Sequence, residues 1–212
     1  MVRSFDRFVA QQKIRSTIPS AKGVFMKRSF AAVLLLASVL TAFPCMSEEI
    51  KSTGTIASYF SPNGGAAEAI VKEINSAKTE VLVQAYSFTS KPIAEALAGA
   101  HKRGVKVVIV LDKSQRSGHT SVDFVAQAGI PTYIDASHLI LHNKTMVLDR
   151  STLITGSFNF TRAAEERNAE NLLIIKGNKP LIDRYLQNFD EHKAHSDAYT
   201  GKAEAPKGAA PQ

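Results

Sequence analysis

Three ionisable residues, His142, Lys144 and Asp149, lie within the eight-residue stretch HNKTMVLD. The rest of the stretch is largely apolar or β-branched, which is typical of a buried β-strand. Burying an ionisable group costs several kcal/mol unless the group is paired. Side chains two apart on a strand share a face, so His142 and Lys144 should point the same way and Asp149 the opposite way. The pattern indicates that these ionisable residues have a functional role.

Polar residues with the same two-residue spacing occur in the next predicted strand. Ser157 and Asn159 share a face of that strand, and Glu170 lies on the one after it. If these strands are neighbours, the side chains converge on one spot that suits a phosphoryl oxyanion. Lys144 would neutralise charge, and Ser157 and Asn159 would donate hydrogen bonds to non-bridging oxygens. Glu170 could hold one ring nitrogen of His142 so that the other faces phosphorus.

The spacing His142-x-Lys144-x4-Asp149 resembles the HKD signature of the phospholipase D superfamily. Gly156-Ser157-Phe158-Asn159, after six intervening residues, is similar to the Gly-Ser-x-Asn element that follows it in that family. AYSFTSKPIAEAL, RGVKVVIVLDKS, GSFNFT and NAEN also resemble the small secreted endonucleases of the superfamily. The resemblance runs from about Thr55 to His192.

This resemblance implies a phosphodiesterase that cuts DNA, with RNA as a second substrate class, without sequence preference. It implies that His142 attacks phosphorus and forms a phosphohistidine, that Glu170 orients His142, and that Asp149 is structural support. The side chains expected to bind the phosphate are Lys144, Ser157 and Asn159. No metal or other cofactor is implied, because lysines supply the charge neutralisation that magnesium would otherwise provide.

The implied reaction uses two histidines, one as nucleophile and one as general acid, but the chain has one H-x-K-x4-D motif. HKRG at His101 and HKAHSD at His192 lack the spacing. The resemblance therefore implies a homodimer in which each subunit gives one motif to a site on the two-fold axis. A chain active as a monomer would need another general acid, for which His119 and His138 are candidates.

Residues 1–47 are predicted to be an N-terminal extension and a secretory signal peptide. The apolar run from Ala31 to Phe43 follows a basic pair and is too short to span a bilayer comfortably. Translation could begin at Met1 or Met26, and cleavage is expected near Ser47. The mature chain is therefore expected to be secreted, with the periplasm as its location.

The leader also holds most of the excess positive charge. Seven of the 26 basic residues and one of the 19 acidic residues lie in it. The mature chain therefore keeps 19 basic and 18 acidic residues, a net charge near +1. The basic pI is therefore no argument for nucleic-acid binding, and any basic surface must be local. Lys113 and Arg116, in a loop at the C-terminal end of a predicted strand, are the candidates for backbone phosphates.

The single cysteine, Cys45, also lies in the leader. Its removal leaves the mature chain without disulfides, cysteine-ligated zinc or a cysteine nucleophile. Lipidation of Cys45 is the alternative, but Phe43 and Pro44 match a lipoprotein signal poorly.

The mature chain alternates predicted strands and helices. Strands are expected at 55–60, 80–88, 105–112, 131–135, 142–149, 152–160 and 168–177, and helices at 66–77, 91–103, 122–129 and 180–195. This order predicts an α/β sandwich with a mixed, mostly parallel sheet covered by helices. We expect one nuclease-like domain over residues 48–196 and a disordered tail over 197–212.

Three alternatives remain beside this interpretation. His138 and His142 are four residues apart, as zinc ligands are on a helix, but on a strand four residues span about 13 Å, which argues against a shared ion. The main alternative function is a phospholipid hydrolase that uses the same HKD site, which would require an apolar patch nearby. A non-catalytic binding module is a third class, and the complete set of site residues argues against it.

Overall fold

The computed structural model describes residues 49–116 and 120–201. The predicted signal peptide, His119 and most of the expected tail lie outside the described residues. The described strands are β1 (Thr55–Ser61), β2 (Glu80–Ala85), β3 (Lys106–Asp112), β4 (Thr132–Asp135), β5 (Lys144–Leu148), β6 (Thr152–Gly156), β7 (Glu170–Lys176) and β8 (Asp197–Tyr199). The helices are α1 (Ala66–Ser76), α2 (Lys91–Lys102), α3 (Thr120–Gln127), α4 (Arg162–Glu166) and α5 (Lys179–Ala194), with a 3-10 turn at Lys113–Arg116.

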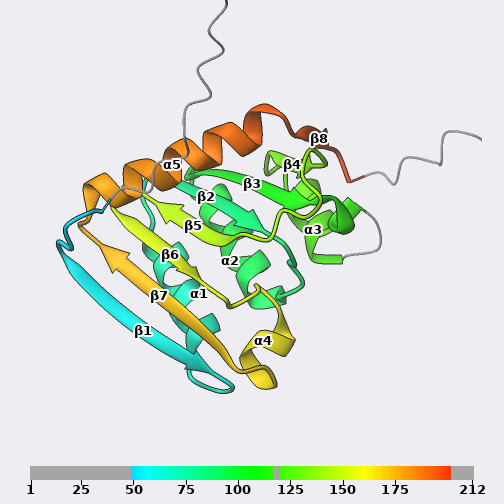
Figure 1. Ribbon diagram of the computed structural model, residues 1–212. Coiled ribbons are helices and arrows are strands. Elements are labelled where there is room, and N and C mark those ends of the chain that lie inside the picture. The colour runs from blue at the N-terminus through cyan, green and yellow to red at the C-terminus, as the bar shows by residue number, and fades with distance from the viewer. Residues whose placement is uncertain (1–48, 117–119, 202–212) are drawn as a thin grey trace, which may run out of the picture. The chain divides into compact units, whose positions relative to one another are not determined.

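One mixed sheet in the order β1-β7-β6-β5-β2-β3-β4-β8 forms the middle layer. Helices α1 and α2 cover one face of this sheet, and α5 lies across the other (Figure 1). Strand β3 shows why both faces are covered. Val107, Ile109 and Leu111 belong to the apolar cluster on the α1 and α2 side, while Val108 and Val110 belong to the cluster under α5. The predicted α/β sandwich with a mixed sheet is confirmed.

The expectation that the sheet is mostly parallel is wrong. Among the described strands, β2 with β3 and β3 with β4 pair in parallel, and the other five pairings are antiparallel. Apolar runs indicate burial on both faces, but they do not set strand direction. The short connection between β5 and β6 leaves no room for a crossover, so these neighbours must be antiparallel.

The C-terminal boundary also differs from the prediction. Residues 197–199 were expected in the tail, but they form β8, which pairs with β4 from Thr132↔Tyr199 to Ile134↔Asp197. The Tyr199 hydroxyl donates a hydrogen bond to Asp123 Oδ1 at 2.6 Å. These contacts join segments far apart in the sequence, so local composition could not reveal them.

At the other end of the sheet, β1 is an edge strand. It pairs with β7 through seven residues, and no described strand pairs with its outer edge. Ile56 and Phe60 on this strand are 55% and 67% exposed.

Across the described part of the chain, none of the helices combines the length and apolar character that a membrane span requires.

Candidate active site

His142 and Lys144 lie at the start of β5, in the middle of the sheet. His142 precedes the strand and is exposed, while Lys144 is its first residue and is 6% exposed. Both lie against Tyr86, just after β2. The centroids of the His142 and Tyr86 rings are 4.6 Å apart, and Lys144 Nζ is 5.1 Å from the centroid of the Tyr86 ring. The two side chains therefore share a face, as their spacing predicts. Sequence reasoning did not find the contact with Tyr86.

The Lys144 ammonium is a cation held in a partly buried place. Burial lowers the pKa of Lys144, and the nearby Glu170 carboxylate opposes this by favouring the charged form. Among the described residues, Nζ donates one hydrogen bond, to the His142 carbonyl oxygen at 2.8 Å. An ammonium has three donors, so two remain for the oxygens of a substrate.

Ser157 and Glu170 form a compact polar group beside Lys144. Ser157 Oγ donates to Glu170 Oε2 at 2.6 Å and accepts from the Asn171 amide at 3.0 Å. The other carboxylate oxygen of Glu170 accepts from Asn168 Nδ2 at 3.1 Å. Neither oxygen hydrogen-bonds His142 within the described part of this single chain, so the orienting role of Glu170 stays a prediction.

The Gly-Ser-x-Asn element has a steric basis at its glycine. Gly156 has a φ of 155°, and a Cβ placed there would lie 2.3 Å from the Asn171 carbonyl oxygen. This close approach lets the Ser157 and Phe158 amides both donate to the same carbonyl, at 3.0 and 3.2 Å. Asn159 follows, and its Oδ1 is buried without a hydrogen-bond partner among the described residues.

Asp149 lies beyond the opposite end of β5 and contacts the start of β2. Its carboxylate accepts hydrogen bonds from the backbone amides of Lys78, Thr79 and Glu80, the closest at 2.7 Å, and from the Thr79 hydroxyl at 2.8 Å. Burial would raise the pKa of Asp149, but these donors outweigh it and hold the pKa below its usual 3.8. The geometry agrees with a supporting role, on the side away from His142.

A cleft of about 400 Å³ opens in front of His142. It is lined by residues 142–145, by Thr155 and Gly156 of β6, and by residues from the middle of α5. The α5 residues are Arg184, Tyr185 and Asn188. Sequence reasoning missed this wall of the cleft. The signal was a polar arginine and asparagine four residues apart on one face of a predicted helix, but nothing local showed which strand that face covers.

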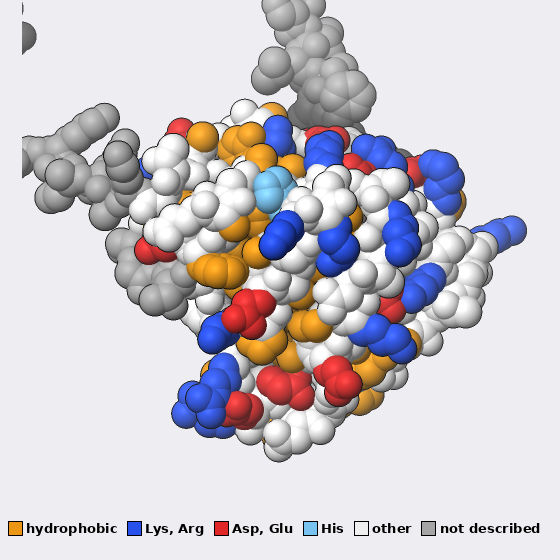
Figure 2. Space-filling view, turned by 180° about the vertical axis from the view of Figure 1, so that it is seen from behind, with side chains coloured by type: hydrophobic (Ala, Val, Ile, Leu, Met, Phe, Trp, Pro, Cys, Tyr) orange, Lys and Arg blue, Asp and Glu red, His pale blue; other side chains and the backbone are white. Residues whose placement is uncertain are grey.

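The two predicted phosphate contacts in the loop after β3 have other partners. Lys113 Nζ donates to the His138 carbonyl oxygen at 3.0 Å, and Arg116 forms an ion pair with Asp197 at 3.0 Å. Neither lines the cleft beside His142. On the face seen in Figure 2, Lys and Arg side chains are spread out with Asp and Glu among them, which is typical of a solvated surface. Arg184 is the arginine that the structure places at the cleft.

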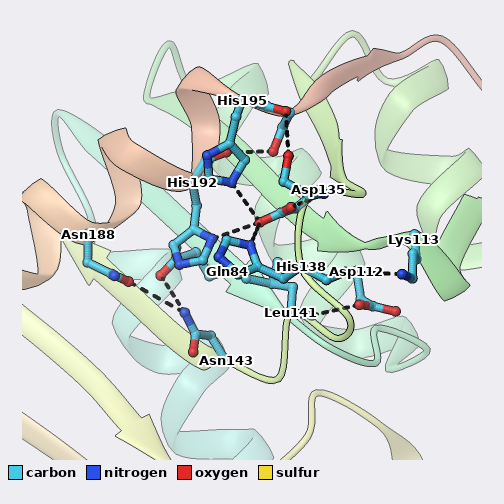
Figure 3. Close-up of polar contacts among 12 residues, drawn as sticks. Gln84, Asp112, Lys113, Asp135, His138, Leu141, Asn143, Asn188, His192 and His195 are labelled. Carbon is cyan, nitrogen blue, oxygen red and sulfur yellow. Dashed lines mark hydrogen bonds and ion pairs between the residues drawn. The ribbon is translucent and has the colours of Figure 1, made fainter. Parts of the chain in front are cut away.

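The His138 ring contacts Asp135, at the end of β4. Its Nδ1 lies 3.1 Å from Asp135 Oδ2, where rings from the end of α5 also converge (Figure 3). The pair His138 and His142 is therefore not brought together on one ion.

Comparisons with known proteins show the family to which the chain belongs. A family model described as cardiolipin synthase, PLD-like domain, matches residues 70–193. Phospholipase D of Rickettsia prowazekii (strain Madrid E) is 39% identical over 148 residues, covering 69% of this chain and 72% of the relative. Phospholipase D of Rickettsia typhi (strain ATCC VR-144 / Wilmington) is 32% identical over 202 residues, covering 92% and 97%.

Among solved structures, the phospholipase D family member Nuc from Salmonella typhimurium superimposes with a TM-score of 0.66 at 37% identity. The match covers 68% of this chain and 97% of that one. The chain thus belongs to the phospholipase D superfamily. Its activity class is that of a phosphodiesterase, a hydrolase of phosphate esters.

Proposed function

We propose that this phosphodiesterase is an endonuclease that cleaves DNA, and RNA as a second substrate, without sequence preference. The observation that carries this proposal is the cleft. It sets an exposed His142 beside the Lys144 ammonium, with Arg184 on the facing helix. These groups match a phosphodiester backbone, which is common to every sequence.

The chemistry would proceed in two displacements at phosphorus. A ring nitrogen of His142 forms a bond to phosphorus while the bond to the leaving oxygen breaks, and that oxygen takes a proton from the partner subunit's His142. Water then attacks the phosphohistidine and gives its proton to the same partner histidine, which frees His142 and a phosphate monoester. Lys144 stabilises charge on the non-bridging oxygens in both steps.

The donor set at the cleft supports cleavage without a metal. The Glu170 carboxylate, whose charge acts on Lys144, already accepts hydrogen bonds at both oxygens, from Ser157 and Asn168. A two-metal site needs several bridging carboxylates. Lys144 and Arg184 can supply the positive charge instead.

A homodimer would bring the second histidine to the site. Leu139 and Ile140, three and two residues before His142, are 85% and 49% exposed. An isologous contact would bury such a pair against its own copy, because the same patch meets itself on a two-fold axis. The unpartnered Asn159 Oδ1 is a further group that a second subunit or a substrate could satisfy.

The same two side chains favour the second candidate, a phospholipid hydrolase. Leu139 and Ile140 form an exposed apolar pair beside the nucleophile, which is the feature that a lipid substrate would require. The relatives from Rickettsia are named phospholipase D.

A paired assay separates the two functions. Purified protein is given supercoiled plasmid and, separately, vesicles of phosphatidylcholine and cardiolipin, each with and without excess chelator at low temperature. We expect plasmid nicking that persists in chelator, with much slower headgroup release, and neither activity in His142→Asn. Phospholipid release without nicking would favour the alternative, and nicking that needs added magnesium would contradict the metal-free mechanism.

Subunit exchange tests the shared site. Wild-type and His142→Asn subunits are mixed in equal amounts and allowed to exchange. Random pairing leaves roughly a quarter of the dimers with both histidines, whereas independent monomers would keep about half of the activity. Retention of half the rate after verified exchange would overturn the shared site.

We also propose that the leader delivers the mature enzyme to the periplasm. The support is the basic pair and apolar run of residues 27–43. N-terminal sequencing of protein from the periplasmic fraction should find a start near Ser47. Full-length protein that stays in the cytoplasmic fraction would contradict the proposal.

A further inference from the structure

A second cluster of chemically active side chains lies outside the cleft, at the end of α5. Asp135 ends β4, His138 lies in the loop after it, His192 is in the last turn of α5 and His195 follows that helix. Figure 3 shows the three imidazoles converging on the one carboxylate. One ligand atom from each of the four residues lies within 4.8 Å of all the others.

The contacts within this cluster are crowded for hydrogen bonds alone. A single oxygen, Asp135 Oδ2, has His192 Nδ1 at 2.7 Å, His138 Nδ1 at 3.1 Å and His195 Nε2 at 3.1 Å. A carboxylate oxygen offers about two lone-pair positions, so three N–H groups cannot all be well placed on it. The other oxygen, Oδ1, already accepts from the Ser137 amide at 2.9 Å. The arrangement suits a cation between the nitrogens and the oxygen better.

The donor types identify the cation class. Three imidazole nitrogens and one carboxylate oxygen form a four-ligand set typical of Zn²⁺, whereas calcium and magnesium prefer oxygen ligands. With bonds of 2.0–2.1 Å, neighbouring ligand atoms in a tetrahedral zinc site lie about 3.3 Å apart. To reach this spacing, the observed contacts of 2.7–3.1 Å with Asp135 Oδ2 would lengthen, and the ligand nitrogens, which lie within 4.8 Å of one another, would adjust around the ion. The Ser137 amide would orient the carboxylate, as outer-shell donors do in metal sites.

The burial of the four side chains provides both an anchor and an entry path. The Asp135 side chain is fully buried, while those of His138 and His195 are 49% and 36% exposed. Two further hydrogen bonds hold the end of α5 in place: the Ser196 hydroxyl donates to the His192 carbonyl at 2.6 Å, and the Ser137 hydroxyl to the His195 carbonyl at 3.5 Å. A cation could enter from the solvent side without any strand moving.

We propose that Asp135, His138, His192 and His195 form a structural Zn²⁺ site that fastens the end of α5 to the loop leading to His142. None of the four residues is among the described residues that line the cleft. Zinc would therefore stabilise the fold and take no part in the chemistry at phosphorus.

Zinc binding by the purified full chain tests the proposal directly. The protein is stripped with chelator, dialysed and titrated with zinc by calorimetry and against a chromophoric chelator, and Co²⁺ is used as a spectroscopic probe. We expect one equivalent per chain and the intense visible bands of four-coordinate cobalt. Zinc about 100-fold above its Kd should raise Tm by roughly 5–10 °C.

Two exposed ligands give variants that should still fold, His138→Ala and His195→Ala. Each should weaken zinc binding by more than the 10–100-fold typical of losing an outer-shell partner, and should abolish the cobalt bands. His101→Ala, a histidine on α2 outside the cluster, is the matched control and should bind zinc as the wild type does. Unchanged binding in both ligand variants, or six-coordinate cobalt alone, would overturn the site.

The readout is independent of the proposed nuclease. His142→Asn should keep zinc and lose cleavage, while His195→Ala should lose zinc and keep cleavage at low temperature. Zinc uptake by a protein that cleaves no nucleic acid would preserve the site and refute the nuclease. Cleavage by a protein that takes up no zinc would refute the zinc site and preserve the nuclease.

Discussion

The two ends of β5 carry one sequence motif but have opposite environments. At the start of the strand, His142 is exposed and Lys144 Nζ has one hydrogen-bond acceptor among the described residues. Beyond the other end, the Asp149 carboxylate accepts hydrogen bonds from three consecutive backbone amides and one hydroxyl. Polar groups with unused bonding capacity can bind a substrate, whereas saturated ones hold the fold. The motif therefore combines a reactive end with a structural end.

Replacing the nucleophile should give the largest effect. We expect His142→Asn to lower plasmid nicking by at least about 10⁴-fold, because the covalent step cannot occur. The free energy of unfolding should change by less than about 0.5 kcal/mol, since the ring is exposed. Nicking assays and urea denaturation measure the two quantities. Substantial residual activity would place the nucleophile elsewhere.

Lys144→Met should separate catalysis from stability at the same end. The loss of a preorganised cation should lower kcat by about 10²–10³-fold. Stability should stay the same or rise, because a partly buried ammonium is replaced by an apolar side chain of similar length. Single-turnover kinetics and urea denaturation of the same preparation provide the test. A strong loss of stability with little change in kcat would assign Lys144 to the fold instead.

Asp149→Ala should have the opposite effects, lowering stability and leaving catalysis intact. Leaving three backbone amides without their acceptor should lower the free energy of unfolding by about 2–4 kcal/mol, with Asp149→Asn intermediate. Activity per folded molecule should be unchanged.

The pH dependence of this loss follows from the lowered pKa of Asp149. The stabilisation is fully present above the usual value of 3.8 and is lost as pH falls through the lower pKa of the folded state. The stability difference between wild type and Asp149→Ala should therefore be constant near neutral pH and shrink below about pH 4. A difference that grows on acidification would contradict the assignment.

The smallest effect concerns charges around the cleft. In the inactive His142→Asn background, DNA affinity should fall with salt at a slope of roughly −2 to −4 on logarithmic axes. Arg184→Gln should reduce the slope by about 1. The double change of Lys113 and Arg116 should do less, because these residues contact His138 and Asp197 away from the cleft. The slopes are measured by fluorescence anisotropy. A larger change in slope for the double variant than for Arg184→Gln would place the binding groove over the loop after β3.

Some strand faces and helix limits, which depend on local sequence patterns, were predicted correctly. The shared face of His142 and Lys144 follows from the period of a strand, and α1 and α2 begin and end within a residue of their predicted limits. The short turn between β5 and β6 could have shown their antiparallel pairing, but the apolar runs elsewhere did not reveal direction.

Contacts between distant segments could not be read in this way. Arg184 and Asn188 face the cleft because α5 packs across β5, and His192 and His195 meet Asp135 because the helix ends over β4. The sequence shows HKAH and DASH as two unrelated spacings 54 residues or more apart, and neither has the form of a known metal motif alone. Similarly, β8 exists through pairing with β4, so its residues looked like the start of a tail.

The open edge of β1 has a consequence for handling the protein in concentrated solution. Alternate residues of this strand direct backbone donors and acceptors away from β7, where no described strand pairs with them, and the side chains of Ile56 and Phe60 beside them are exposed. Such an edge is a template for strand addition by another copy, which ends in aggregation rather than in a closed dimer. Phe60→Lys should delay turbidity in concentrated stocks without altering nicking, and light scattering over time would measure the gain in shelf life.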